Sequence, residues 1–363
     1  MNIYLCSTVR NLLFAILKAI GESDNKCLIL MVVDQQNIDT SDYDLSALPK
    51  HIKIQFISRK SIRSKLDSHA FGKILRLLAT LNVKTFSSLR QYTGVYLFNR
   101  MLGGSGIEVG KVEKLFLFND RNRLARLLRL AFTEYSIIED GLANYYGNRL
   151  KRFESLWRRL SNHPHKKRFL GDDERCKEIF LLAPELAPVE IQYKVRPIAF
   201  IDQKNILDFC YGFFKFEPGS DYDHDSSWIL ATQPVSIAGL SESGFDIVIY
   251  RKILEYLKQA GIHVVIKVHP RENPDRYRVE FPDYQILESK VPLEIMILGS
   301  SSKRSIVSIY STAGMGFERY CRRITLIRDE ESEFMCDTFT SWEKDESLLE
   351  TRISTQLEEM LVQ

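Results

Sequence analysis

The sequence lacks the short motifs that mark the commonest nucleotide, metal and hydrolase sites. Its 363 residues contain no Walker loop, no GxGxxG after a strand, no HExxH and no GxSxG. The six cysteines stand singly, without a CxxC pair or the spacing of metal ligands. We therefore expect reduced thiols, as in a cytoplasmic protein, and no resident metal.

Long apolar runs and a strong net charge are also missing. No segment reaches the roughly 18 uninterrupted apolar residues that a membrane span needs. Arg10 and Lys18 interrupt the apolar opening, which predicts a strand at 2–6 and then a helix rather than a signal peptide. The formal net charge is +3, with 45% hydrophobic and 27% charged residues, as in an ordinary globular protein. This balance gives no general attraction to nucleic acid.

Short apolar runs alternate with helix-like periodic segments, and this alternation predicts parallel sheets covered on both faces. Strands are expected at 2–6, 27–33, 52–57, 114–120 and 135–138, and again within 226–234, 261–270, 305–314 and 324–330. Helices are expected in the second half at 246–260, 292–298, 313–321 and 345–363. The segment 214–227 is rich in Gly, Pro, Asp and Ser, so it predicts a linker between two α/β domains, 1–213 and 228–344.

Polar residues of unusual chemistry stand where four of these strands end. In open α/β sheets, ligands bind outside the carboxyl ends of the strands. The four strand ends are Glu139-Asp140 before Gly141, Gln233-Pro234, His269-Pro270 and Ser311-Thr312. Taken singly, each has an ordinary explanation as a turn, a strand terminator or a helix cap. Together they predict a set of functional groups at one edge of each sheet.

The chemistry of this set is that of group transfer. A carboxylate can remove a proton from an acceptor hydroxyl, and an imidazolium can stabilise or protonate a departing phosphate. Ser and Thr hydroxyls bind phosphate oxygens together with the free N–H groups of a helix N-terminus. The sequence therefore predicts a site for a phosphate-activated donor that needs no metal.

Other polar segments are given ordinary interpretations. The run 221–225 (DYDHD) belongs to the predicted linker, 102–106 (LGGSG) to a flexible loop, and His163-Pro164 follows no strand. Two readings of the basic, tryptophan-containing stretch 148–168 stay open: a surface helix that packs its apolar stripe on the core, or a helix that lies on an anionic membrane. Nucleic-acid binding is not favoured, because no stacking platform accompanies the charge.

The motifs EDG (139–141), HP (269–270) and ST (311–312), in this order, resemble those of bacterial sialyltransferases with the GT-B fold. The opening 1–20 and the segments ATQP (231–234) and PLEIMI (292–297) support the resemblance, which covers most of the chain. The sequence looks closest to glycosyltransferase family 52, the lipooligosaccharide sialyltransferase type, with the capsule polysialyltransferases as relatives. The resemblance implies an α/β fold of two Rossmann-like domains facing a central cleft. It also implies that the C-terminal helix 345–363 packs back on the first domain.

The resemblance further implies an inverting transfer of sialic acid from CMP-sialic acid to an oligosaccharide, such as a lipid-linked surface glycan. It assigns the general base to Glu139 or Asp140, with the first position favoured, and the acid to His269. The residues assigned to substrate binding are Gly141, Gln233, Pro234, Lys267, Pro270, Ser311 and Thr312, with Ser7, Thr8 and Arg10 on the acceptor side. The enzyme would work in the cytoplasm, peripherally at the inner face of the plasma membrane.

Two other functions remain open at this point. One is a GT-B transferase for a UDP- or GDP-linked sugar, whose diphosphate would use cations such as Lys267, Arg271, Lys303 and Arg304. The other is a binding subunit of a glycan-assembly complex without catalytic activity. In that case, removal of Glu139 or His269 would leave function intact.

Overall fold

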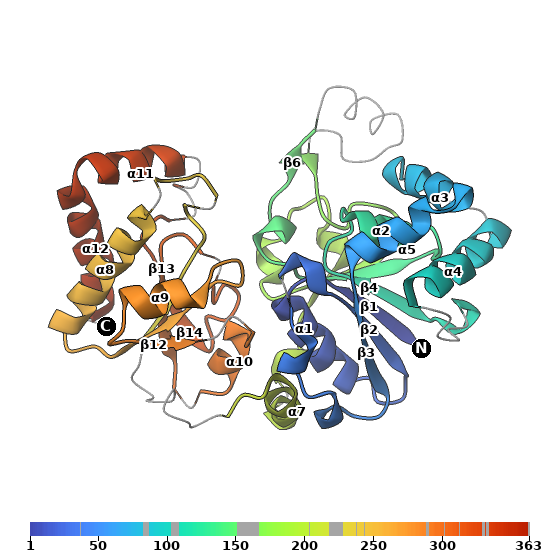
Figure 1. Cartoon of the computed structure of the whole chain (residues 1–363), viewed down its shortest axis with the longest axis horizontal. Coiled ribbons are helices and arrows are strands. Elements are labelled where there is room, and N and C mark those ends of the chain that lie inside the picture. The colour runs from blue at the N-terminus through green and yellow to red at the C-terminus, as the bar shows by residue number, and fades with distance from the viewer. Residues whose placement is uncertain are drawn as a thin grey trace. The chain divides into compact units, whose positions relative to one another are not determined.

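The chain forms two compact α/β units in a computed structural model, Met1–Lys215 (unit 1) and Phe216–Gln363 (unit 2) (Figure 1). The structure describes residues 1–36, 38–82, 87–102, 109–150, 167–202, 204–217, 228–236, 238–242, 244–287, 290–300, 302–311, 313–328, 331 and 334–361. Each unit contains its own parallel sheet, which confirms the predicted fold class of two Rossmann-like α/β domains.

Unit 1 is built on a seven-stranded parallel sheet in the order β3-β2-β1-β4-β5-β8-β9. Its strands are β1 (Asn2–Cys6), β2 (Cys27–Val32), β3 (Ile52–Ile57), β4 (Lys114–Leu117), β5 (Tyr135–Ile138), β8 (Cys176–Leu181) and β9 (Val195–Pro197). The residues of β1, β2 and β5 are all buried, as expected for strands covered on both faces. The strand order reverses between β1 and β4, so ligands are expected at the carboxyl ends of these two strands.

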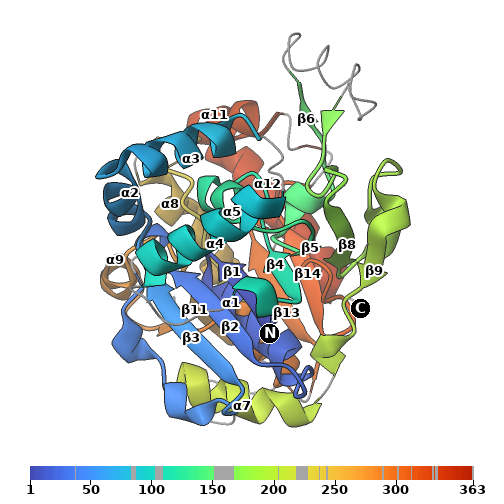
Figure 2. The same ribbon diagram turned by 90° about the vertical axis from the view of Figure 1, so that its right-hand side faces the viewer.

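Helices cover both faces of this sheet. Figures 1 and 2 show α1 and α7 on one face and α2, α3, α4 and α5 on the other. The helices are α1 (Val9–Ile20), α2 (Arg59–Asp67), α3 (Ala70–Thr80), α4 (Ser87–Leu102), α5 (Arg123–Leu128) and α7 (Lys204–Phe214). Short 3₁₀ turns are η1 (Val33–Gln35), η2 (Thr40–Asp42), η3 (Leu45–Ala47), η4 (Val109–Lys111), η5 (Leu142–Asn144), η6 (Pro184–Leu186), η7 (Gln192–Lys194) and η8 (Phe200–Asp202). A two-stranded antiparallel ribbon, β6 (Asn148–Arg149) with β7 (Lys167–Arg168), completes unit 1.

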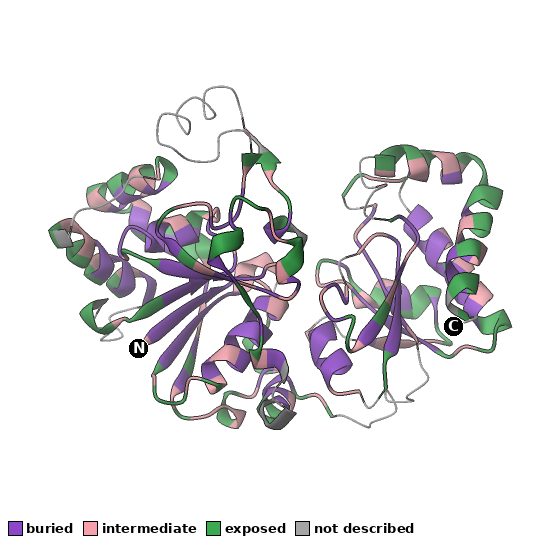
Figure 3. Ribbon diagram, turned by 180° about the vertical axis from the view of Figure 1, so that it is seen from behind, coloured by how far each residue is buried: buried purple, intermediate pink, exposed green. Residues whose placement is uncertain are grey.

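Unit 2 is built on a five-stranded parallel sheet in the order β12-β11-β10-β13-β14. Its strands are β10 (Trp228–Ala231), β11 (Val264–Lys267), β12 (Gln285–Leu287), β13 (Arg304–Ser308) and β14 (Cys321–Thr325). Its helices are α8 (Phe245–Gln259), α9 (Pro274–Glu280), α10 (Leu293–Leu298), α11 (Met335–Lys344) and α12 (Glu346–Leu361). The order reverses between β10 and β13, and the buried core lies on both sides of the sheet (Figure 3).

Most of the predicted strands and helices are present. Strands β8, β9 and β12 were not predicted, because each is short or interrupted by charged residues. The helix predicted over 313–321 is wrong, since the described residues there form turns. Gly314 and Gly316 have φ of +75° and +80°, a left-handed conformation that a continuous α-helix does not contain. Of the predicted linker, residues 218–227 lie outside the described residues.

The predicted C-terminal helix is α12, and it packs against α8 and β14 within unit 2. Leu349, Ile353 and Leu357 lie on one side of α12 at helical spacing, and all three are buried in the core of that unit. None of the helices in the described parts of the chain has the length and apolar character required to cross a bilayer.

Candidate functional site

Glu139 follows β5 at the carboxyl edge of the unit 1 sheet, and its carboxylate is buried and fully hydrogen-bonded. The side chain is 2% exposed, and its Oε1 accepts a hydrogen bond from Arg10 Nη2 at 2.9 Å. Its Oε2 accepts from the Leu182 N–H at 2.8 Å and from the Tyr145 hydroxyl. Burial and the negative charge of Glu139 raise the pKa of Tyr145 well above its ordinary value, so Tyr145 remains a hydrogen-bond donor. These partners hold the carboxylate in one orientation.

Asp140 points to a different environment, which is half-buried and contains neutral donors. Its Oδ1 accepts from Asn11 Nδ2 at 3.0 Å and its Oδ2 from Asn119 Nδ2 at 3.4 Å. The backbone N–H of Asp140 donates to Asn144 Oδ1 at 2.8 Å, which closes the loop behind it. Gly141 then adopts φ of +129°, so the Asp-Gly turn expected from the sequence is present beside the acidic pair.

The residues predicted on the acceptor side follow β1 and have different roles. The Ser7 hydroxyl accepts from Asn122 Nδ2 at 3.4 Å, and the Ser7 N–H donates to Asn11 Oδ1 at 3.2 Å. Thr8 caps α1 by accepting the Asn11 N–H at 3.1 Å. Asn11 thus contacts both Ser7 and Asp140, whereas the hydroxyl of Thr8 caps the N-terminus of α1.

Three asparagines of this edge, Asn11, Asn119 and Asn122, were missed in the sequence. Asn119 and Asn122 follow β4, the neighbour of β5 in the sheet, and Asn11 lies in the first turn of α1. The sequence does show polar residues, Asn119 and Asp120, at the end of the predicted strand 114–120. It did not show which strand is the neighbour of β5, and only the sheet order gives that information.

A basic cleft of about 650 Å³ adjoins the acidic pair within unit 1. Asn119 and Asn122 line it and also contact Asp140 and Ser7. Its charged lining residues are Arg59, Lys60, Arg63, Arg76, Arg121 and Arg123, with Asp34 as the acidic one. The excess of cations gives this cleft a preference for anionic ligands.

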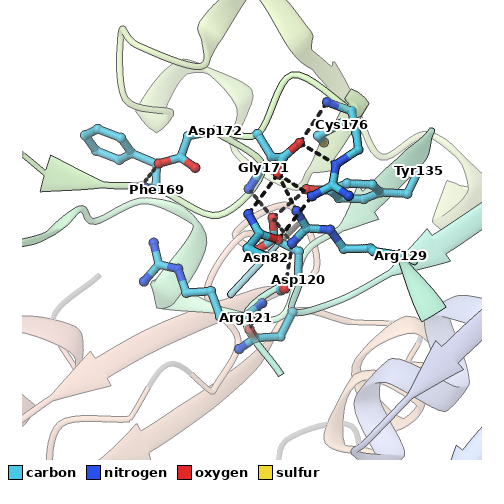
Figure 4. A network of polar contacts seen from close by, with 12 residues as sticks. Asn82, Asp120, Arg121, Arg129, Tyr135, Phe169, Gly171, Asp172 and Cys176 are labelled. Carbon is cyan, nitrogen blue, oxygen red and sulfur yellow. Dashed lines mark hydrogen bonds and ion pairs between the residues drawn. The ribbon is translucent and has the colours of Figure 1, made fainter. Parts of the chain in front are cut away.

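The loop that carries Asn119 and Asn122 is fixed by a buried polar network (Figure 4). The Asp120 carboxylate accepts from the Tyr135 hydroxyl at 2.7 Å and from the Gly171 N–H at 3.3 Å. Arg129, 2% exposed, donates to the Asp120 carbonyl at 3.0 Å and pairs with Asp173. These contacts tie the loop after β4 to the segment before β8.

Asp173 is the carboxylate of this network that contacts several cations. Arg175 Nη2 donates to the Asp173 carboxylate at 2.9 Å, and Lys194 Nζ donates to the Asp173 carbonyl at 2.8 Å. Burial alone raises the pKa of Asp173, but the hydrogen bonds from Arg175 and the charge of Arg129 outweigh it and lower this pKa well below its ordinary value. Asp173 is therefore an ionised carboxylate that keeps buried cations paired.

In unit 2, Gln233 joins the two strands at which the strand order reverses. It follows β10, and its side-chain Oε1 accepts from the Tyr310 N–H beyond β13 at 2.8 Å. The backbone N–H of Gln233 donates to the buried Tyr250 hydroxyl at 2.6 Å. Pro234 comes next at this edge and is half-buried. Gln233 thus links the ends of β10 and β13, where the nucleotide is expected to bind.

His269 lies half-buried beyond the end of β11, next to the buried Lys267. Its Nδ1 accepts a hydrogen bond from the Arg271 N–H at 3.1 Å. Burial, with the positive charges of Arg271 and Lys267, lowers the pKa of His269 from 6.5 to about 4. At neutral pH the imidazole is therefore uncharged, and its proton is on Nε2, where it can donate to a ligand. Pro270 follows, half-buried, in the same turn.

Thr232 and Glu272 support His269 and were also missed in the sequence. The Thr232 hydroxyl accepts from the His269 N–H at 2.9 Å and donates to Glu272 Oε2 at 2.7 Å. The Tyr277 hydroxyl donates to Glu272 Oε1 at 2.7 Å. Burial raises the pKa of Glu272, although its hydrogen bonds partly oppose this. Thr232 was within the predicted ATQP strand end, but its partner Glu272 belongs to another loop.

Ser311 lies beyond β13, where phosphate binding was expected. Its hydroxyl accepts from the Ala313 N–H at 3.0 Å, and its carbonyl accepts from Arg323 Nη2 at 3.0 Å. Thr312, the second residue of this predicted motif, lies outside the described residues. In the described parts of the chain, no group of three or more His, Cys, Asp or Glu side chains is arranged to hold a metal ion.

Comparisons with known proteins identify the family of this chain. The family model of the alpha-2,8-polysialyltransferases (POLYST) matches residues 2–327. A protein of Haemophilus influenzae, described only as an uncharacterized protein, is 26% identical over 215 residues, which are 58% of this chain and 67% of that protein.

Solved sialyltransferase structures are also similar to this chain. The alpha/beta-galactoside alpha-2,3-sialyltransferase of Photobacterium phosphoreum is 14% identical, with a TM-score of 0.49 over 89% of this chain and 88% of that chain. The GT-B domain of the Photobacterium damselae sialyltransferase is 10% identical, with a TM-score of 0.46 over 94% of this chain and 96% of that chain.

The family match covers almost the whole of the 363 residues, including both units. It confirms the predicted relationship to bacterial sialyltransferases, and the family is the one that the sequence indicated as a relative. The nearer likeness to glycosyltransferase family 52 stays a prediction. The chain belongs to the alpha-2,8-polysialyltransferase family, and it is a glycosyltransferase that moves sialic acid.

Proposed function

We propose that the protein transfers sialic acid from CMP-sialic acid to a hydroxyl of an anionic bacterial surface glycan, with inversion and without a metal. The observation that carries this proposal is the shared edge in unit 1, where the acidic pair and the basic cleft have Asn119 and Asn122 in common. A proton acceptor for a sugar hydroxyl therefore adjoins a surface that attracts negative charge.

The general base in this proposal is Glu139. The acceptor oxygen attacks the anomeric carbon, the bond from that carbon to the CMP phosphate breaks, and the hydroxyl proton passes to the carboxylate. Leu182 and Tyr145 hold Oε2, which leaves Oε1 as the oxygen that exchanges its partner. The present partner of Oε1 is Arg10, whose side chain is 17% exposed, so an entering acceptor reaches Oε1 by displacing the guanidinium.

His269 has the complementary role on the donor side. Its Nε2–H donates to a phosphate oxygen of CMP, and the negative charge of that phosphate raises the pKa of the imidazole from its low value in the free protein. A protonated His269 can then neutralise the departing CMP. Ser311 and Thr312 hold the phosphate in this proposal, and Gln233, Pro234, Lys267 and Pro270 form the nucleotide side.

The acceptor is an anionic glycan, such as a chain that ends in sialic acid. Its carboxylates match the cations of the basic cleft, among which Arg121 lies in the same loop as Asn119 and Arg123 begins α5. Ser7 and Gly141 would lie beside the acceptor hydroxyl. Lipooligosaccharide, O-antigen and capsule are all surface polymers that fit this description, and the reaction would take place on the cytoplasmic side, before export.

The test compares the two carboxylates of the acidic pair. Glu139→Gln should lower kcat by about a hundredfold or more, because it removes the base but keeps most of the hydrogen bonds. Asp140→Asn should have a smaller effect, about tenfold, through its contacts with Asn11 and Asn119. The readout is CMP release from CMP-sialic acid with a sialylated oligosaccharide as acceptor.

Glu185→Gln, an exposed carboxylate of unit 1, is the matched control and should retain full activity. The opposite ranking would assign the base to Asp140, which is half-buried whereas Glu139 is buried. Nearly full activity in both variants would remove the acidic pair from the mechanism.

A further inference from the structure

The outward side of α3 carries an apolar stripe that the fold does not bury. Ile74, Leu77 and Leu81 are 52%, 59% and 63% exposed, and their spacing of three and four residues places them on one side of the helix. The opposite side is buried and carries Gly72, Leu75 and Ala79. Because the opposite side of α3 makes the contacts with the core, the exposed apolar side chains do not contribute to the packing of unit 1.

The stripe continues onto α4 through aromatic contacts. The Phe71 ring of α3 lies 5.2 Å from the Tyr92 ring and 4.9 Å from the Tyr96 ring of α4. Tyr92 and Val95, one helical turn apart, are 60% and 45% exposed. Figures 1 and 2 show α3 and α4 as neighbours on the same side of the sheet. We call the surface of Ile74, Leu77, Leu81, Tyr92 and Val95 the α3–α4 face.

The segment that carries this face is strongly positive. Residues 59–102 contain nine lysines and arginines and one acidic residue, Asp67, although the whole chain carries only +3. The rest of the chain is therefore net negative. Arg59, Lys60, Arg63 and Arg76 of this segment line the basic cleft. Lys65 and Lys73 do not line it, are exposed, and form no ion pair within the part of the chain that the structure describes. Lys73 borders Ile74 and lies one turn before Leu77.

We propose that the α3–α4 face docks on the anionic surface of a lipid bilayer. A helix whose exposed side is apolar and whose flank is lysine-rich lies in the headgroup region, with the apolar side chains inserted and the ammonium groups on the lipid phosphates. A second copy of the same face is a poorer occupant, since it would bring two strongly positive segments together. This contact would keep the enzyme near acceptors held in the membrane.

The surface is independent of the basic stretch 148–168, of which residues 151–166 lie outside the described residues. Lys65, Lys73 and the apolar residues of the face do not line the basic cleft, and they are not part of the acidic pair or the strand ends of unit 2. The inference therefore does not depend on the proposed transfer reaction.

The experiment is co-sedimentation of the full chain with vesicles of phosphatidylcholine alone or of phosphatidylcholine with phosphatidylglycerol. The wild type should bind the anionic vesicles and not the neutral ones. Ile74→Ser with Leu77→Ser should weaken binding about tenfold, because two inserted side chains are lost. Lys65→Gln with Lys73→Gln should also weaken binding about tenfold, and it should reduce the dependence on salt.

Two control pairs match these changes elsewhere on the chain. Val279→Ser with Leu348→Ser removes exposed apolar side chains, 79% and 49% exposed, from unit 2. Lys53→Gln with Lys258→Gln removes two exposed lysines outside the segment 59–102. Both control pairs should bind vesicles like the wild type. Unchanged thermal unfolding of all the variants shows that the fold is retained.

Three outcomes would overturn the proposal. The first is a wild type that does not bind anionic vesicles. The second is equal vesicle binding by the Ile74→Ser, Leu77→Ser variant, which would leave only general electrostatic adsorption. The third is a wild-type dimer in solution that this variant converts to a monomer, without vesicle binding, which would make the face a contact between copies of the chain.

Discussion

The two units hold their proposed reactive groups in opposite electrostatic environments. In unit 1, Glu139 is buried, and its Oε1 accepts a hydrogen bond from the Arg10 guanidinium at 2.9 Å. In unit 2, His269 is half-buried beside Lys267 and Arg271, which favour the neutral imidazole. The proposed base therefore lies against a charge of the opposite sign, and the proposed acid lies beside charges of its own sign. The acid becomes protonated only when a phosphate brings negative charge to it.

The supports of these groups differ as well. The acidic edge of unit 1 depends on buried charges, since Asp120, Arg129 and Asp173 fix the loop that carries Asn119. The His269 turn of unit 2 depends on hydroxyl groups, since Thr232 and Tyr277 both donate to Glu272. Loss of one partner should therefore cost more in unit 1 than in unit 2.

The largest effect is expected from Arg129→Met in unit 1. The change removes the buried cation that contacts both Asp120 and Asp173, and only Arg175 then remains paired with Asp173. Breaking a buried ion pair costs about 3–5 kcal/mol of the free energy of unfolding. Urea denaturation should show this loss. Arg251→Met, which removes an exposed ion pair with Glu280, should cost no more than about 1 kcal/mol. Equal costs would contradict the structural role of the network.

The next effect concerns His269 as the acid on the donor side. His269→Asn keeps a hydrogen-bond donor but removes the titrating group, so kcat should fall by about a hundredfold. The loss should be smaller with a donor whose leaving group is more acidic, because such a group departs without a proton. A uniform loss with both donors would reduce His269 to a binding residue.

The low pKa of His269 also predicts how stability depends on pH. Between pH 6.5 and about 4 the unfolded chain takes up a proton at this position and the folded chain does not. The contribution of His269 to the free energy of unfolding is therefore lost as the pH falls through this window. His269→Asn should unfold with a shallower pH dependence over the same range. CMP should also flatten the wild-type curve, by raising the pKa of His269.

The smallest effect is expected from Thr232→Val, which breaks the hydroxyl chain of unit 2. The variant leaves Glu272 and the His269 N–H each short of one partner, at a cost of about 1–3 kcal/mol in stability. Thr232→Ser keeps the hydroxyl and should restore most of the loss. If serine is no better than valine, loss of the hydroxyl does not explain the lower stability.

The sequence predicted the strand ends well because an end depends on local information. An apolar run stops, and polar residues such as Glu139 or His269 follow it. The partners of these residues could not be predicted, because Asn119 contacts Asp140 only through the sheet order and Glu272 reaches Thr232 from another loop. The segment after Ser311 was misjudged because its apolar spacing resembles a helix. Its glycines instead adopt left-handed turns, and a Cβ at Gly314 would lie 2.8 Å from Cys321 Sγ.

The most direct test of the central claim is transfer from three donors in parallel. The protein is incubated with a sialylated oligosaccharide and one of three donors: CMP-sialic acid, a UDP-sugar or a GDP-sugar. The mass of the oligosaccharide is then measured by mass spectrometry. The account predicts the gain of one or more sialyl residues, with matching CMP release, from CMP-sialic acid alone. A sugar gained from the UDP- or GDP-linked donor, or no product from CMP-sialic acid, would contradict it.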